Sequence, residues 1–188
     1  KFLGVRPMIQ DIPNVDWMLH EDVQWAYRAL IDLDLSFDAL GFPKHISNFL
    51  KISQRYPKLR IVFDHSLKPQ IRDQQAGCDA FSEWAKGISQ LSELTNGYCK
   101  LSGLITEAKD GWSADDIQPF AQHVIEAFGP KRVTWGSDWP VCRLQVEYDE
   151  WYKLSQSLTK GLSAIERDQI FGLNATEFYR LGQEERKL

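Results

Sequence analysis

The chain has 188 residues, of which 43% are hydrophobic and 26% charged, a composition typical of a globular protein with a sizeable core. The formal net charge is −4 and the basic residues are scattered, which argues against binding to nucleic acid or to an anionic membrane surface. No apolar run approaches the roughly 20 residues that cross a bilayer, and the three cysteines are widely spaced. We therefore expect a single domain over residues 1–188, in the cytoplasm, with reduced thiols.

Strand and helix signals alternate along the sequence. Short runs rich in β-branched and aromatic residues indicate strands, and apolar residues at helical spacing indicate helices. In chain order, the prediction is strand 2–6, helix 15–31, strand 35–40, helix 46–56, strand 60–65, helix 78–94, strand 98–101, helix 113–128, strand 132–136, and helices 147–158, 163–171 and 174–181. Ser113 and Asp116 are spaced as a capping box, and Asn174 is predicted to cap the last helix.

This alternation predicts a parallel sheet with helical crossovers, for which two architectures compete. Five β/α units can form a complete doubly wound sheet, or they can be the last five units of an eight-stranded barrel. Several of the strands end in a polar or charged residue, and a barrel gathers such residues at one mouth. The sequence has no Gly-x-Gly-x-x-Gly turn and no phosphate loop, which weakens the nucleotide-binding version of the doubly wound sheet. We therefore favour the barrel.

Two strands end in residues suited to hydrolytic or metal chemistry. Asp138 follows the apolar strand 132–136, where a carboxylate can accept a proton from water or bind a metal. His65 ends strand 60–65, and its imidazole can polarise a carbonyl, carry a proton or bind a metal. The alternatives are a structural or helix-capping carboxylate for Asp138 and a hydrogen-bonded core histidine for His65.

Five further residues are candidates for substrate binding. Arg6 can hold a carboxylate or lactone oxygen through two parallel hydrogen bonds, and Lys68 can stabilise a developing anion. Ser102 ends another strand and can orient a ligand, while Trp112 and Trp139 can form walls for a sugar-like ring. The alternatives are salt bridges for the two cations and ordinary core packing for the aromatic residues.

The motifs together resemble those of the amidohydrolase-related (amidohydrolase 2 type) family of TIM-barrel metal-dependent hydrolases, in its sugar lactonase group of L-fuconolactonases and L-rhamnonolactonases. The matching pieces are Gly4-Val5-Arg6, Asp64-His65-x-x-Lys68-Pro69, Lys100-Leu101-Ser102-Gly103-Leu104, Phe128-Gly129-Pro130-x-Arg132, Gly136-Ser137-Asp138-Trp139-Pro140, Asn174-Ala175 and Phe178-Tyr179-Arg180-Leu181. The resemblance implies an α/β fold, a (β/α)8 TIM barrel of which this chain holds about strands 4 to 8. The family's first strand carries a His-x-His pair that has no match in this sequence.

The resemblance implies a hydrolase of carbohydrate catabolism that opens a sugar-acid lactone. Water would attack the carbonyl, with Asp138 as base or metal ligand and His65 as carbonyl polariser, proton carrier or second metal ligand. The resemblance leaves open whether the reaction uses a divalent metal such as zinc or no metal. It also leaves open whether the protein forms oligomers. The alternatives are a metal-dependent decarboxylase on the same barrel and an inactive barrel fragment.

Overall fold

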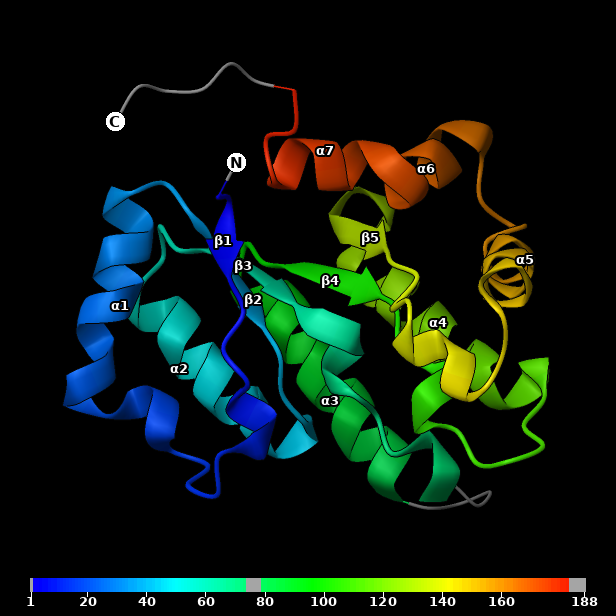
Figure 1. The fold of residues 1–188 in the computed structure, drawn as a ribbon, viewed down its shortest axis with the longest axis horizontal. Coiled ribbons are helices and arrows are strands. Elements are labelled where there is room, and N and C mark those ends of the chain that lie inside the picture. Colours follow the sequence, from blue (N-terminus) through cyan, green and yellow to red (C-terminus); the bar gives the residue numbers. More distant parts are fainter. Residues whose placement is uncertain (1, 74–78, 183–188) are drawn as a thin grey trace.

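The computed structural model describes residues 2–73 and 79–182. Within these ranges five strands form one sheet in the order β1-β2-β3-β4-β5, and all neighbouring strands are parallel (Figure 1). The strands are β1 (Gly4–Val5), β2 (Ser36–Ala39), β3 (Arg60–Phe63), β4 (Tyr98–Leu101) and β5 (Val133–Trp135). Each strand lies beside the one that follows it in sequence. This order is that of a barrel wall, and it lacks the reversal of order that defines the switch point of a doubly wound sheet.

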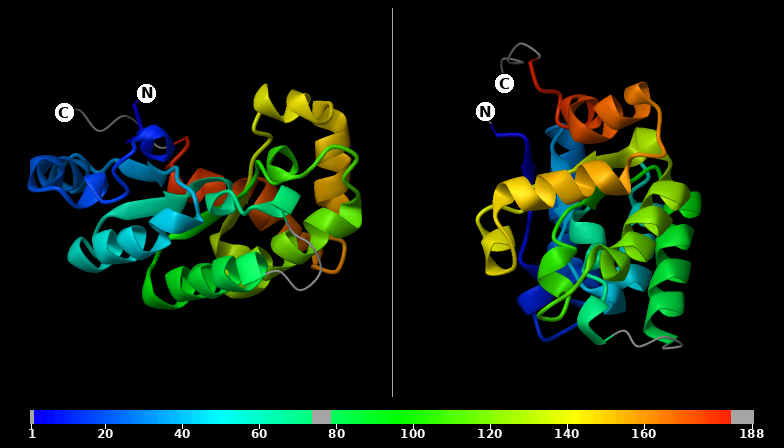
Figure 2. Two further views of the ribbon diagram at one scale, coloured as in Figure 1. Left: turned by 90° about the horizontal axis from the view of Figure 1, so that it is seen from below. Right: turned by 90° about the vertical axis from the view of Figure 1, so that its right-hand side faces the viewer.

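Helices connect the strands near the predicted positions. They are α1 (Glu21–Asp32), α2 (Ile46–Arg55), α3 (Asp79–Leu94), α4 (Ala114–Phe128), α5 (Tyr148–Leu158), α6 (Ala164–Asp168) and α7 (Asn174–Phe178). Helices α2 and α3 lie along one side of the sheet (Figure 2). The predicted first residue of α3, Cys78, lies outside the described residues, as does the tail after Gly182. No helix in the described ranges is long and apolar enough to cross a membrane.

The prediction that Asn174 caps a new helix was wrong. A π-helical turn, Gln169–Leu173, follows α6 directly, and the backbone of Asn174 is already helical. Its buried side-chain amide instead donates hydrogen bonds of 2.7 Å to the carbonyl oxygens of Pro130 and Val133. The side chain therefore fastens the C-terminal helices to the start of β5, a tertiary role that local sequence cannot reveal.

The two faces of the sheet differ in chemistry because successive side chains of a strand point to opposite sides. One face is apolar and packs on the helices: the Phe37 ring lies 5.4 Å from that of Tyr27 in α1, and Phe63 lies 6.0 Å from Phe128 in α4. The other face carries Asp38 and other polar side chains. The residues on it are Ser36, Asp38, Arg60, Val62, Tyr98, Lys100 and Thr134. The polar face is the one on which charged groups meet.

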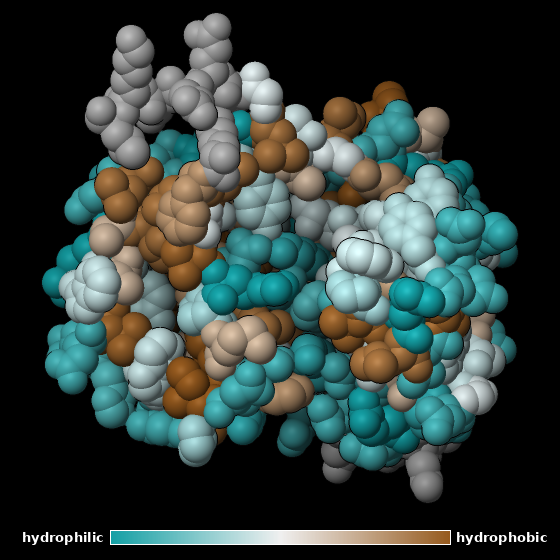
Figure 3. Space-filling view, in the orientation of Figure 1, coloured by the Kyte–Doolittle hydropathy of each residue, from teal (hydrophilic) through white to brown (hydrophobic). Residues whose placement is uncertain are grey.

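The β1 side of the sheet is exposed. Phe2 and Val5 retain 70% and 39% of their accessible surface. In the space-filling view, apolar atoms gather near β1 (Figure 3), and polar groups cover much of the rest of this face.

Candidate active site

The loop after β3 presents His65 at the carboxyl end of the sheet. Four consecutive residues, His65 to Lys68, have left-handed backbones with φ between 50° and 56°. Non-glycine residues avoid this conformation at a cost of about 1–2 kcal/mol each, so the loop needs support from its surroundings. The Ser66 hydroxyl donates to the Lys100 carbonyl at 3.0 Å, and the Trp84 indole donates to the Ser66 carbonyl at 2.8 Å. These bonds tie the loop to β4 and α3.

Both nitrogens of the His65 ring face specific partners. Nδ1 lies 2.8 Å from the Ser102 hydroxyl, while Nε2 lies 3.5 Å from Asp138 Oδ1 and 3.7 Å from Asp64 Oδ2. Gly103 allows this placement, because a Cβ there would lie 2.8 Å from Nδ1. The imidazole is therefore oriented by Ser102 on one side and presented to carboxylates on the other.

Asp138 faces His65 from the end of β5. Its backbone is left-handed, with φ 53°, and its side chain is 15% exposed, so water can reach the carboxylate. Burial raises the pKa of Asp138, and burial lowers the pKa of His65 despite the neighbouring carboxylates. The pair therefore combines a mostly neutral imidazole with a carboxylate that is a stronger base than usual, as general base catalysis requires.

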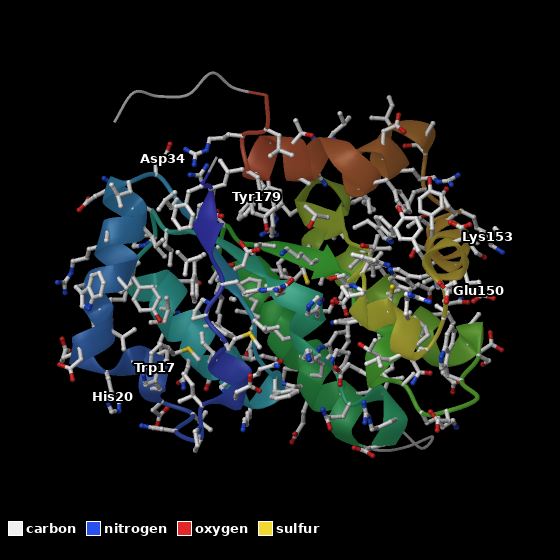
Figure 4. The ribbon with its side chains drawn as sticks, in the orientation of Figure 1. Trp17, His20, Asp34, Glu150, Lys153 and Tyr179 are labelled. Atoms are coloured by element: carbon white, nitrogen blue, oxygen red, sulfur yellow. The ribbon has the colours of Figure 1, made fainter. Side chains whose placement is uncertain are left out.

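A charge cluster, which we define as Arg6, Asp38, Asp64, Lys100 and Tyr179, lies beside this pair and is largely buried except at Arg6. Asp64, at 1% side-chain exposure, contacts Arg6 Nη1 at 3.1 Å and Lys100 Nζ at 3.1 Å. Lys100 also contacts Asp38 at 2.6 Å, and the Tyr179 hydroxyl donates to the same carboxylate at 2.6 Å. Tyr179 lies between α7 and the strands (Figure 4). Burial raises the pKa of the Asp64 carboxyl, but the charges of Lys100 and Arg6, with that of His65 when it is protonated, outweigh burial and leave the pKa below its usual value.

Sequence reasoning did not select Asp38, Asp64, Lys100 or Tyr179 as site residues. Asp64, Lys100 and Tyr179 occur in the motifs given above, and Asp38 lies inside the predicted strand 35–40, but no residue in the sequence indicates which charges pair. A signal was nevertheless available: charged residues inside short apolar strands are costly unless paired, so Asp38 and Lys100 required partners.

The remaining predicted substrate-binding residues have contacts of their own outside the His65–Asp138 pair. Lys68 Nζ is 3.5 Å from Glu107 Oε1, so this cation already has a buried partner. Trp139 follows Asp138 and is 63% exposed. The indole of Trp112 donates to the side chain of Gln145 at 3.1 Å. The structure thus brings His65 into contact with Ser102 and Asp138, and Arg6 is linked to His65 through Asp64. The substrate roles of Arg6, Lys68, Trp112 and Trp139 stay predictions.

Comparison with known proteins agrees with this arrangement of strands and motifs. The family model described as Amidohydrolase matches residues 1–181. The chain belongs to the amidohydrolase family. A curated relative, the L-fucono-1,5-lactonase of Burkholderia ambifaria, is 39% identical over an alignment of 185 residues that covers 96% of this chain and 62% of that protein. The L-fucono-1,5-lactonase of Burkholderia multivorans is 32% identical, over 96% of this chain and 64% of its own length.

A solved structure shows the same fold. An amidohydrolase from Burkholderia multivorans, crystallised with bound HEPES, superposes with a TM-score of 0.90 at 32% identity, over 95% of this amidohydrolase chain and 64% of the other. A second crystal form of that amidohydrolase contains bound zinc and gives a TM-score of 0.89. The chain thus spans less than two thirds of the length of these relatives.

The described side chains do not provide a complete zinc site. Catalytic zinc usually takes three protein ligands and leaves one position open for water. His65 and Asp138 offer two facing donors, while both oxygens of Asp64 already face cations. No group of three or more histidine, cysteine, aspartate or glutamate side chains in residues 2–73 and 79–182 is arranged to hold a metal. We therefore derive no catalytic step through a metal from these residues.

Proposed function

We propose that the protein is a hydrolase that opens a sugar-acid lactone in carbohydrate catabolism. The observation that carries this proposal is the contact of His65 Nε2 with Asp138 Oδ1 at 3.5 Å, with the imidazole oriented by Ser102. Hydrogen bonds between catalytic groups are often long before substrate binds, so this separation is compatible with direct cooperation. The two L-fucono-1,5-lactonases among the relatives support the substrate class.

In the proposed reaction, Asp138 accepts a proton from a water molecule as the water oxygen attacks the lactone carbonyl carbon. The raised pKa of Asp138 favours this proton transfer near neutral pH. His65 polarises the carbonyl or carries the proton onward to the ring oxygen. The bond between the carbonyl carbon and the ring oxygen then breaks, and the product is an open-chain hydroxy acid.

Arg6 is proposed to steer the substrate. One guanidinium nitrogen contacts Asp64, yet the side chain is 50% exposed, so further N–H donors can reach a hydroxyl or carbonyl oxygen of the lactone. Asp64 holds this guanidinium at the edge of the site. A polyhydroxylated ring suits such polar surroundings better than an apolar ester.

The test is acid release, followed with a pH indicator, from a panel of aldonolactones, with EDTA and with added zinc. We expect the full chain to hydrolyse at least one lactone, and Asp138→Asn to lower kcat about 10²–10⁴-fold, the usual contribution of a general base. Asp32→Asn, a change at the exposed end of α1, is the matched control and should retain the activity.

Folded protein that releases no acid from any lactone would overturn the proposal. The release of carbon dioxide from carboxylated substrates would then favour a decarboxylase on the same barrel. Equal activity of Asp138→Asn and Asp32→Asn would instead remove Asp138 from the mechanism.

A further inference from the structure

Two carboxylates compete for one imidazole nitrogen in this site. His65 Nε2 lies 3.5 Å from Asp138 Oδ1 and 3.7 Å from Asp64 Oδ2. The nitrogen can direct only one proton or one lone pair at a time. Asp138 can act with His65 on a substrate only if Asp64 does not take the imidazole for itself.

Two cations hold Asp64 from both of its oxygens. Arg6 Nη1 contacts Oδ2 at 3.1 Å, and Lys100 Nζ contacts Oδ1 at 3.1 Å. Arg6 is half exposed, so substrate can engage it, whereas the Lys100 side chain is only 18% exposed. Lys100 is therefore the partner of Asp64 that stays in place whatever occupies the mouth of the site.

Strand register explains why Lys100 reaches Asp64. Phe63, the last residue of β3, pairs with Cys99 in β4, so Asp64 leaves the end of β3 beside Lys100. Lys100 itself lies on the polar face of the sheet with Asp38. Asp38, with the Tyr179 hydroxyl bonded to it, contacts Lys100 at 2.6 Å, so the ammonium is fixed between two carboxylates.

We infer that Lys100 is a positioning residue for the proposed reaction: it holds Asp64 away from His65 and so leaves the imidazole to Asp138. This inference depends on the proposed function for its kinetic effect but not for its structural effect. The rival explanation is that Lys100 only balances the buried charges of Asp38 and Asp64.

The kinetic test is a double-mutant cycle on the full chain, with the lactone that the parent hydrolyses. Lys100→Gln should lower kcat about 10²-fold, the cost of misplacing a catalytic group by about 1 Å, with a much smaller change in KM. In the Asp64→Asn background, Lys100→Gln should cost little, because no competing carboxylate is left to restrain. Lys100→Arg retains the cation and should recover most of the kcat. Lys51→Gln, at a remote exposed lysine of α2, is the matched control.

Losses that multiply in the double variant would overturn the inference, because Lys100 would then act independently of Asp64. The double variant removes one anion and one cation together, so it keeps the buried charges balanced. If Lys100→Gln does not fold, the double variant compared with Asp64→Asn still decides the question: equal kcat supports the inference, and a large further loss overturns it.

A second readout needs no activity, so it separates this inference from the proposed lactonase function. The ¹⁵N NMR signals of the His65 ring, assigned with His65→Gln, report the hydrogen bonding of Nε2. We expect Lys100→Gln to shift the Nε2 signal and Lys51→Gln to leave it unchanged. Unchanged signals in folded Lys100→Gln would overturn the inference even if the parent hydrolyses no lactone.

Discussion

Replacing Gly103 by alanine should destabilise the protein through a direct collision with His65. The added Cβ would lie 2.8 Å from Nδ1, 2.9 Å from Cγ and 3.0 Å from Cβ of His65. Rotation of the ring does not relieve the last of these contacts, and the His65 backbone is already left-handed. Overpacking of this kind typically costs about 1–3 kcal/mol. Gly103 also has φ 65°, and alanine in a left-handed conformation costs a further ~1–2 kcal/mol.

Gly111 provides the matched control. Its φ is 72°, but nothing lies within 4 Å of a Cβ built there. Gly111→Ala therefore suffers the backbone strain alone. Both substitutions lower the conformational entropy of the unfolded chain by the same amount, so this effect cancels in the comparison. We expect Gly103→Ala to lose about 1–3 kcal/mol more of the free energy of unfolding than Gly111→Ala, the overpacking cost.

Urea titrations followed by far-ultraviolet circular dichroism measure this difference, provided that the m-values of the variants agree. Each kcal/mol should also lower Tm by about 2–4 °C for a chain of this size. If the proposed function holds, kcat should fall in Gly103→Ala only, because only that variant displaces His65. Equal losses of stability in the two variants would refute the packing argument.

Three further predictions concern stability away from the site. Ser113→Ala should cost about 1 kcal/mol at pH 7, because Asp116 accepts hydrogen bonds from the Ser113 amide at 2.7 Å and hydroxyl at 2.9 Å. These bonds lower the pKa of Asp116, so their contribution is present above its unfolded pKa of about 3.9 and disappears as pH falls through the lower folded value. The gap between parent and Asp116→Asn in urea titrations should therefore close in acid, and a constant gap would contradict this account. Asn174→Ala should cost about 1–3 kcal/mol because it leaves buried carbonyls without a donor, and an equal loss in exposed Asn14→Ala would argue otherwise.

The sequence by itself determined the alternation of strands and helices and, for β4, both ends of the strand, whereas the other four predicted strands run one or two residues beyond the observed strands at one or both ends. Tyr98–Leu101 and the end of α4 at Phe128 match the predicted bounds, because β-branched and aromatic runs, capping residues and Gly129-Pro130 act locally. It also placed His65 and Asp138 after the carboxyl ends of two strands, since a short apolar run that stops at polar residues indicates where a strand ends.

Only the tertiary structure decided which of these groups meet. Lys100 contacts Asp38 and Asp64 through the register of three strands, and Ser102 reaches His65 only because the loop after β3 turns left-handed. Asn174 looked like a cap in the sequence, yet its amide bonds to the start of β5. Pairing energies among buried charges depend on distance and desolvation, which residue order does not contain. The sequence therefore determined the order of strands and helices along the chain, and the tertiary structure determined which charged groups pair.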